Sequence, residues 1–76
     1  MPRAEPDSAL AAVLKRLREE HEEAQESLAH RAGISKGALQ EIEGARSAPA
    51  WGTVRRIARA LGVSMADIGA AVDAER

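Results

Sequence analysis

Apolar residues recur along the first part of the chain with the three-to-four-residue period of a helix. The periodic stretch begins near Ser8, a candidate N-cap, and it places Leu10, Leu14 and Leu17 on one stripe. No glycine or proline interrupts the acidic run that follows, so we expect this helix to end near Glu22. The chain therefore begins with one amphipathic helix.

Two shorter helices follow, separated by a turn at Gly33. The first is expected over residues 25–32, and Gly33 after it can adopt the left-handed conformation that is common beyond a helix end. The second is expected over about residues 36–43, with Ser35 as its N-cap and Gly44 at its end. The pattern predicts two short helices joined by a tight turn.

Two further helices are expected in the second half of the chain. Residues 50–61 have a helical apolar period. Trp51 at the start of this segment could anchor an interface, but we expect it to lie in the core. Ser64 and Asp67 have the spacing of a capping box, so a fifth helix is expected over residues 65–72. No segment has the alternating pattern of a strand, and we predict an all-α, compact five-helix domain.

The size and composition fit a single small domain. A chain of 76 residues can bury one modest core. It has no cysteine, and neither a long apolar run nor a signal-peptide core, so we expect a cytoplasmic protein without membrane contact. We expect the domain over residues 8–72, a flexible N-terminal arm over 1–7 and a short C-terminal tail over 73–76.

The charged residues are unevenly distributed. The net charge of −1 would by itself disfavour a nucleic-acid partner. However, residues 27–62 carry six basic and two acidic side chains, whereas the flanking segments are acidic overall. The basic segment contains the two short helices around Gly33, which is the arrangement of a helix-turn-helix motif.

Three blocks of sequence carry a family resemblance. They are Q-E-S-L-A-H-R-A-G-I-S at residues 25–35, I-E-G at 42–44 and P-A-W-G-T-V-R-R-I-A-R-A-L-G-V-S at 49–64. In this order and spacing they resemble the Cro/CI, or Xre-type, family of lambda-repressor-like domains, over about residues 10–68. The resemblance implies a sequence-specific, double-stranded DNA-binding transcriptional regulator, repressor-like and homodimeric, whose second and third helices form the helix-turn-helix motif.

The resemblance also assigns roles to individual positions. The positions that face base edges are Lys36, Gly37, Gln40 and Glu41. The positions that lie against the DNA backbone are Gln25, Ser35, Arg46, Ser47 and Thr53. Arg18 and Glu43 match an ion pair that joins the first helix to the end of the third.

The chemistry of the recognition positions agrees with these roles. Lys36 can donate to guanine O6 and N7 or neutralise a phosphate, and Gln40 can pair with adenine. Glu41 can accept a hydrogen bond from cytosine N4. Gly37 has no side chain with which to contact a base, so we expect it to permit close approach of the backbone.

The chain departs from the family pattern at one junction. Glu22 and Glu23 stand where a glycine and an apolar residue are usual, and Ala24 stands where serine or threonine usually caps the second helix. These departures affect the connection between the first two helices. They leave the recognition helix unchanged.

Other functions find less support in the sequence. His21 and His30 lack partners at metal-ligand spacing, and no catalytic arrangement is present, so we expect no metal, cofactor, small-molecule ligand or enzyme activity. The alternative is a protein-interaction or antitoxin-like module on the same scaffold, which the acidic first helix favours. For a homodimer contact we expect Ile68 and Val72 near the C-terminus.

Overall fold

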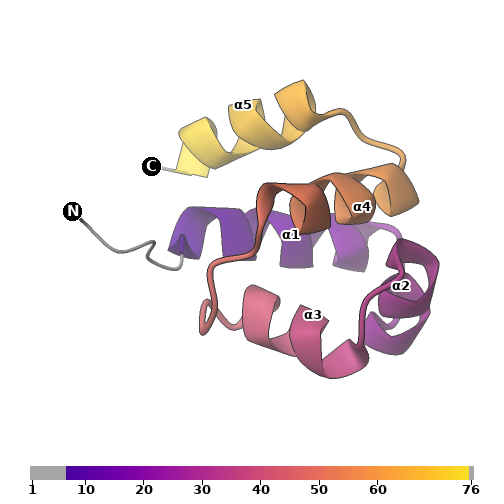
Figure 1. The fold of residues 1–76 in the computed structure, drawn as a ribbon. Coiled ribbons are helices and arrows are strands. Elements are labelled where there is room, and N and C mark those ends of the chain that lie inside the picture. Colours follow the sequence, from indigo (N-terminus) through magenta and orange to yellow (C-terminus); the bar gives the residue numbers. More distant parts are fainter. Residues whose placement is uncertain (1–6, 76) are drawn as a thin grey trace.

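The computed structural model describes residues 7–75, and over this range it contains five helices and no strand. The helices are α1 (Ser8–Glu20), α2 (Gln25–Ala32), α3 (Lys36–Glu43), α4 (Trp51–Leu61) and α5 (Met65–Glu75). In Figure 1, α5 lies above α1 and α4, α3 lies below them, and α2 stands at one end. The all-α, five-helix architecture predicted from the sequence is confirmed.

Both ends of the domain differ in detail from the expectation. The N-cap of α1 is Asp7 and not Ser8, because the Asp7 carboxylate accepts hydrogen bonds from the N–H groups of Ala9 at 2.9 Å and Leu10 at 3.1 Å. At the other end α5 continues to Glu75, so the described part of the expected C-terminal tail is helical. Residues 1–6 of the expected arm lie outside the described range.

The core is formed by apolar side chains from all five helices. Four of the largest are completely buried: Leu14, Leu28, Leu39 and Ile57. Ile68 brings α5 into the same cluster, whereas Leu10 and Leu17 pack against it while only partly buried. The apolar stripes recognised in the sequence therefore face one common core.

Trp51 is not part of the core, and here the expectation was wrong. Its side chain is 68% exposed, although its spacing from Val54 and Ala58 fits the buried stripe of α4. Side chains on a helix lean toward the N-terminus of that helix. Because Trp51 is the first residue of α4, its ring extends past the end of the core.

The junction between α1 and α2 explains the unusual residues found there. The helix α1 ends at Glu20, two residues before the expected end, and Glu22 adopts a left-handed conformation with φ of 52°. This is the position at which the resembled family has glycine. Glu22 therefore adopts a conformation that glycine adopts most easily.

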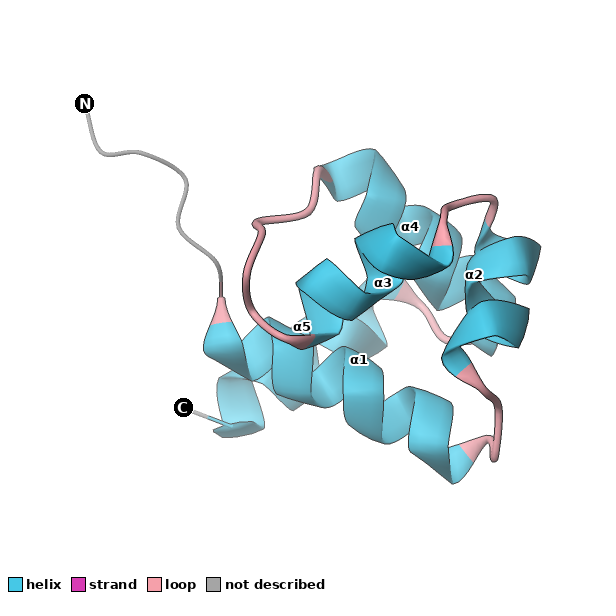
Figure 2. Cartoon of the chain, turned by 90° about the horizontal axis from the view of Figure 1, so that it is seen from below, coloured by secondary structure: helices cyan, strands magenta, loops and turns pink. Residues whose placement is uncertain are grey.

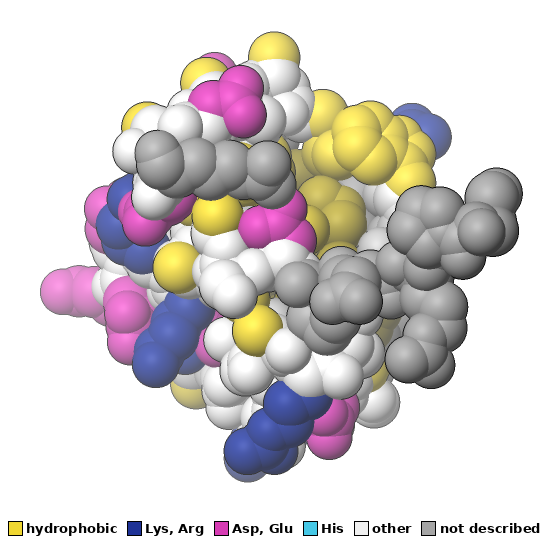
Figure 3. Space-filling view, turned by 90° about the vertical axis from the view of Figure 1, so that its left-hand side faces the viewer, with side chains coloured by type: hydrophobic (Ala, Val, Ile, Leu, Met, Phe, Trp, Pro, Cys, Tyr) yellow, Lys and Arg dark blue, Asp and Glu magenta, His cyan; other side chains and the backbone are white. Residues whose placement is uncertain are grey.

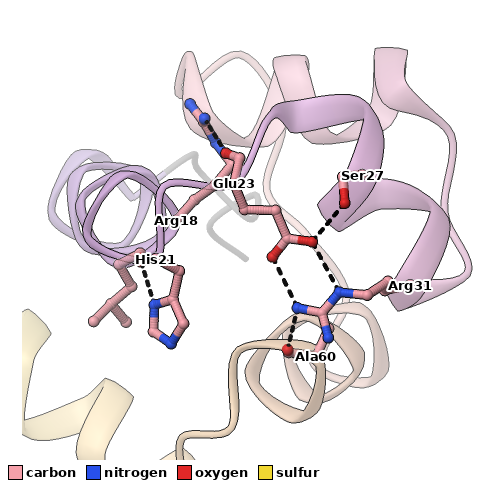
Figure 4. Close-up of polar contacts among 7 residues, drawn as sticks. Arg18, His21, Glu23, Ser27, Arg31 and Ala60 are labelled. Atoms are coloured by element: carbon pink, nitrogen blue, oxygen red, sulfur yellow. Dashed lines mark hydrogen bonds and ion pairs between the residues drawn. The ribbon is translucent and has the colours of Figure 1, made fainter.

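Glu23 connects this junction to α2 and α4. Its carboxylate accepts two hydrogen bonds from Arg31 and one from Ser27, each at 2.8 Å (Figure 4). Arg31 also donates to the carbonyl oxygen of Ala60 at 2.6 Å. The hydrogen bonds from Arg31 and Ser27 lower the pKa of Glu23 to about 2. Glu23 thus forms polar contacts at a position where the resembled family has an apolar residue. We name its pairing with Arg31 the Glu23–Arg31 clamp.

Candidate DNA-binding surface

The outer side of α3 forms the centre of the candidate site. Ser35 caps this helix by accepting a hydrogen bond from the N–H of Ala38 at 3.0 Å. The inner side is buried and consists of Leu39, Ile42 and Glu43. The outer side is exposed and consists of the four predicted base-facing residues, Lys36, Gly37, Gln40 and Glu41. Figure 2 shows α3 at the front of the face seen from below.

The side chains on this outer face have room for a ligand. Among residues 7–75, no side chain forms an ion pair or hydrogen bond with Lys36, Gln40 or Glu41. A Cβ atom added to Gly37 would meet nothing within 4 Å. The structure therefore places an accessible surface of one cation, one amide and one carboxylate around a residue without a side chain.

A buried ion pair fixes the C-terminal end of α3 on its inner, buried side. Arg18 donates to the Glu43 carboxylate at 2.8 Å and 3.0 Å, and these side chains are only 12% and 3% exposed. The Nε2 of Gln25 donates to the same carboxylate at 3.0 Å, and Arg18 also donates to the carbonyl of Glu23 at 2.9 Å. The hydrogen bond to Glu43 raises the pKa of Arg18. This network fixes α3 to both α1 and the start of α2.

The two helix starts that flank α3 lack side-chain caps. Asp7, Ser35 and Ser64 cap the starts of α1, α3 and α5. Ala24 and Ala50 precede α2 and α4 and cannot do so. Figure 2 shows α3 lying between the start of α2 and the start of α4. First-turn N–H groups and the positive ends of two helix dipoles are therefore left for anions near the recognition helix.

The loop after α3 brings a further cation to this face. Ala45 has a left-handed φ of 56°, and the N–H of Arg46 donates back to the carbonyl of Glu41 at 2.9 Å. Arg46 and Ser47 are exposed, while Thr53 in the first turn of α4 is partly buried. A Cβ added to Gly44 would lie 3.7 Å from Nε of Arg46, so the arginine side chain lies over this glycine.

The structure also contains an apolar hollow that the sequence analysis did not predict. Trp51 stands beside a hollow of about 270 Å³ that Leu10, Met65 and Val72 also line. Figure 3 views this end of the molecule and shows hydrophobic side chains gathered around the hollow. Ile68, expected to be available for a dimer contact, is only 4% exposed because it belongs to the core. The spacing of Trp51 favours the core over the alternative of an interface anchor, whereas the structure exposes this residue.

Two other kinds of site are not found in the described chain. Within residues 7–75 no group of three or more His, Cys, Asp or Glu side chains could hold a metal ion. No helix of that same range has both the length and the apolar character required to cross a membrane.

The helices α2 and α3, joined by the tight turn at Gly33, form a helix-turn-helix motif whose second helix has an exposed outer face. A family model described as a helix-turn-helix domain matches residues 9–71. The chain therefore belongs to the helix-turn-helix domain family. No curated protein matches the chain.

Solved structures of gene regulators share this fold. The clp gene regulator ClgR from Corynebacterium glutamicum is 27% identical with a TM-score of 0.86, over 96% of this chain and 78% of that chain. The wild-type restriction-modification controller protein C.Esp1396I is 22% identical with a TM-score of 0.86, over 96% and 94%.

An HTH_3 family transcriptional regulator from Vibrio cholerae is 32% identical with a TM-score of 0.80, over 86% of this chain and 36% of that longer chain. Together, the helix-turn-helix family match and the fold shared with a gene regulator at 27% identity support a DNA-binding transcription regulator.

Proposed function

We propose that this regulator binds duplex DNA as a homodimer, with α3 of each protomer in the major groove. The observation that carries the proposal is the exposed outer face of α3, whose polar side chains have no partner among residues 7–75. A helix fits the roughly 12 Å wide major groove. We propose that the protein binds DNA without catalysing a reaction. We propose that it does so in the cytoplasm.

Base recognition is assigned to the outer face of α3. Lys36 stands in the first turn of the helix and is suited to guanine O6 and N7, while Gln40, one turn later, is suited to adenine. Glu41 accepts from cytosine N4 and disfavours sequences that place a phosphate or a guanine O6 beside it. Gly37, with open space around it, allows the helix to approach the floor of the groove.

Backbone contacts are assigned to the two flanks of α3. Because the amide nitrogen of Gln25 donates to Glu43, its backbone N–H at the uncapped start of α2 is the group proposed to meet a phosphate. On the other flank, Arg46, Ser47 and Thr53 are proposed to contact the opposite strand. The hydroxyl of Ser35 caps α3 and can still donate to a phosphate.

The apolar hollow beside Trp51 is proposed as the dimer contact. Its lining residues lie in or directly beside α1, the start of α4 and α5, and none comes from α3, so a two-fold contact through it would leave the outer face of α3 uncovered in both protomers. The contact falls on Trp51, Leu10 and Val72, because Ile68 is buried.

Selection of random duplexes by the purified protein tests this function. The selected sequence should show two-fold symmetry and bind ~10³-fold or more above scrambled DNA. Lys36→Ala should weaken binding to the selected site by about 1–3 kcal/mol while scarcely changing binding to scrambled DNA. Arg46→Ala should weaken both and reduce the salt slope by about one.

Lys15→Ala is the matched control, because Lys15 is an exposed lysine of α1 that is not among the residues assigned to DNA contact. It should bind both DNAs as the unmodified protein does. Equal and weak binding of every duplex would overturn the proposal, and a co-purifying protein in that case would favour the protein-interaction alternative.

A further inference from the structure

Three arginines on α4 form a second basic surface that the proposed DNA-binding face does not use. The inner stripe of α4 is buried and consists of Val54, Ile57, Ala58 and Leu61. Its exposed stripe repeats with helical spacing and consists of Gly52, Arg55, Arg56 and Arg59, here named the arginine stripe. The whole of α4 contains no acidic residue. One side of this helix is therefore purely basic.

The charges of the arginine stripe are not neutralised by neighbouring side chains. No ion pair or side-chain hydrogen bond from Arg55, Arg56 or Arg59 is formed within residues 7–75. Arg31, the nearest basic residue on α2, differs because its guanidinium is held by Glu23. Three unpaired guanidinium groups on one short helix create a concentrated positive potential.

The surface around the stripe has the shape of an open trough. One hollow of about 280 Å³ is lined by Gly52 and the three arginines. A second, of about 480 Å³, is lined by Arg56, Arg59, His30 and Gly33, among others, and it extends to the C-terminal end of α2. Because Arg56 and Arg59 line both hollows, the trough is continuous along α4.

The trough faces a different direction from the recognition helix. In Figure 1 α4 lies in front of α1 and above α3, and in Figure 2, where α3 faces the viewer, α4 lies toward the upper edge. The buried stripe of α4 packs against α2, α1 and α5, so the arginine stripe points to the side of the molecule. A duplex held by α3 alone would not cover it.

We infer that the arginine stripe binds the phosphate backbone of duplex DNA outside the segment held by α3. Protein interfaces bury an apolar centre, and the exposed arginine stripe has no apolar side chain to form one. A polar and strongly positive surface is typical of backbone contacts to DNA, and guanidinium groups suit phosphate oxygens. The phosphates can come from the flanks of the same duplex after bending or from a second duplex.

The inference goes beyond the proposed function, and its test uses a two-charge variant with a matched control. Arg56→Gln/Arg59→Gln removes two charges from the trough. Lys15→Gln/Arg16→Gln removes the same number of basic side chains from α1, where Arg16, unlike the stripe arginines, pairs with Glu20 and Glu75. Circular dichroism and urea unfolding establish that each variant keeps its fold.

The first arm tests for a second duplex. Protein is bound to an immobilised 30-base-pair duplex of the selected sequence and offered a labelled 20-base-pair duplex of scrambled sequence, at low and high salt. Capture of the labelled duplex should fall at least tenfold in the stripe variant and less than twofold in the control. The salt slope of capture should fall by about two, since two phosphate contacts are lost.

The second arm tests for bending of one duplex. The affinity for the selected site is compared in 20- and 60-base-pair duplexes, with donor and acceptor dyes at the ends of the longer one. If the flanks are the source, the longer duplex binds more tightly, its ends approach, and both effects disappear in the stripe variant only. Either positive arm supports the inference.

The inference is overturned if the stripe variant behaves as the control in both arms, or if a poly-glutamate peptide binds the trough while scrambled DNA does not. Failure of the proposed function would look different, since the unmodified protein would then not prefer the selected sequence. In that event the inference is tested separately, by comparing how tightly Lys36→Ala/Arg46→Ala protein binds the scrambled duplex with and without Arg56→Gln/Arg59→Gln. Weaker binding with the stripe substitutions supports the inference, and equal binding overturns it.

Discussion

The carboxylate of Glu43 is almost fully buried, and its charge is acceptable there only because Arg18 and Gln25 donate to it. Removing one partner of a buried ion pair leaves the other uncompensated, which destabilises a protein more than loss of an exposed pair. We predict that Arg18→Ala lowers the free energy of unfolding by about 3 kcal/mol, measured by urea denaturation.

Arg16→Ala is the control for this prediction. Arg16 is 47% exposed and pairs with Glu20 and Glu75 at the surface, so its loss should lower the free energy of unfolding by less than about 1 kcal/mol. Equal effects of the two substitutions would show that the Arg18–Glu43 pair contributes no more than a surface contact.

A second residue-scale prediction concerns the left-handed backbone at Glu22. A non-glycine residue in this conformation carries a steric penalty of roughly 1–2 kcal/mol, and Glu22 is exposed. Glycine relieves the penalty but increases the entropy of the unfolded chain. We expect Glu22→Gly to raise the free energy of unfolding by about 0.5–1 kcal/mol, measured by thermal unfolding.

Glu19→Gly provides the contrast, because Glu19 lies in the last turn of α1 with helical geometry. There glycine should lower the free energy of unfolding, by up to about 1 kcal/mol. Destabilisation by both substitutions would mean that the left-handed turn carries no relievable strain.

At the scale of elements, the clamp between Glu23 and Arg31 makes stability depend on pH. Arg31 and Ser27 lower the pKa of Glu23 from 4.5 to about 2, so the folded state holds this proton less tightly than the unfolded state. The contribution is complete above the unfolded pKa and is lost as the pH falls toward 2. Glu23→Gln should lower stability at pH 7 and flatten the decline between pH 5 and pH 2.

Glu26→Gln is the matched control for the clamp, since Glu26 is exposed in the first turn of α2 and no side-chain partner holds it. This variant should keep the steep acid decline of the unmodified protein. Denaturant midpoints at closely spaced pH values measure both. If the stability of Glu23→Gln declines with falling pH as steeply as that of the unmodified protein, the clamp is not the cause of the decline.

The helices themselves were predictable because their signals are local. Apolar periodicity, the cap at Ser35 and left-handed glycines at positions 33 and 62 all act within a few residues, and α2 and α3 begin and end as expected. The end of α1 was misplaced because the stop is a left-handed Glu22, which a search for glycine does not find. The sequence therefore predicted a helix boundary correctly where the residue type usual at that boundary is present, and misplaced it where another residue type stands there.

At the scale of the whole molecule, contacts between distant segments were harder to foresee. The pairing of Glu23 with Arg31 and Ala60 joins three segments whose separation follows no periodic rule. The Arg18–Glu43 pair was expected only through family resemblance, since on α1 alone Arg18 has the pattern of a solvated charge. The DNA-contacting roles of the outer residues of α3 remain predictions that the binding experiments test.

The molecular-scale prediction is that the hollow beside Trp51 mediates dimerisation. Large aromatic residues at the centre of an interface typically contribute 2 kcal/mol or more. Trp51→Ala should therefore weaken dimerisation roughly 30-fold or more in sedimentation experiments without DNA. Lys36→Ala, on a different face, should leave dimerisation unchanged while weakening DNA binding. Equal sedimentation of Trp51→Ala and unmodified protein would exclude this surface.

The position of Trp51 also determines what intrinsic fluorescence can measure in this protein. It is the single tryptophan, and the chain has no tyrosine or phenylalanine, so intrinsic fluorescence comes from this one ring. Because Trp51 is 68% exposed in the folded protomer, we expect its emission to change little when the protomer unfolds. A blue shift will instead report that something has covered the hollow.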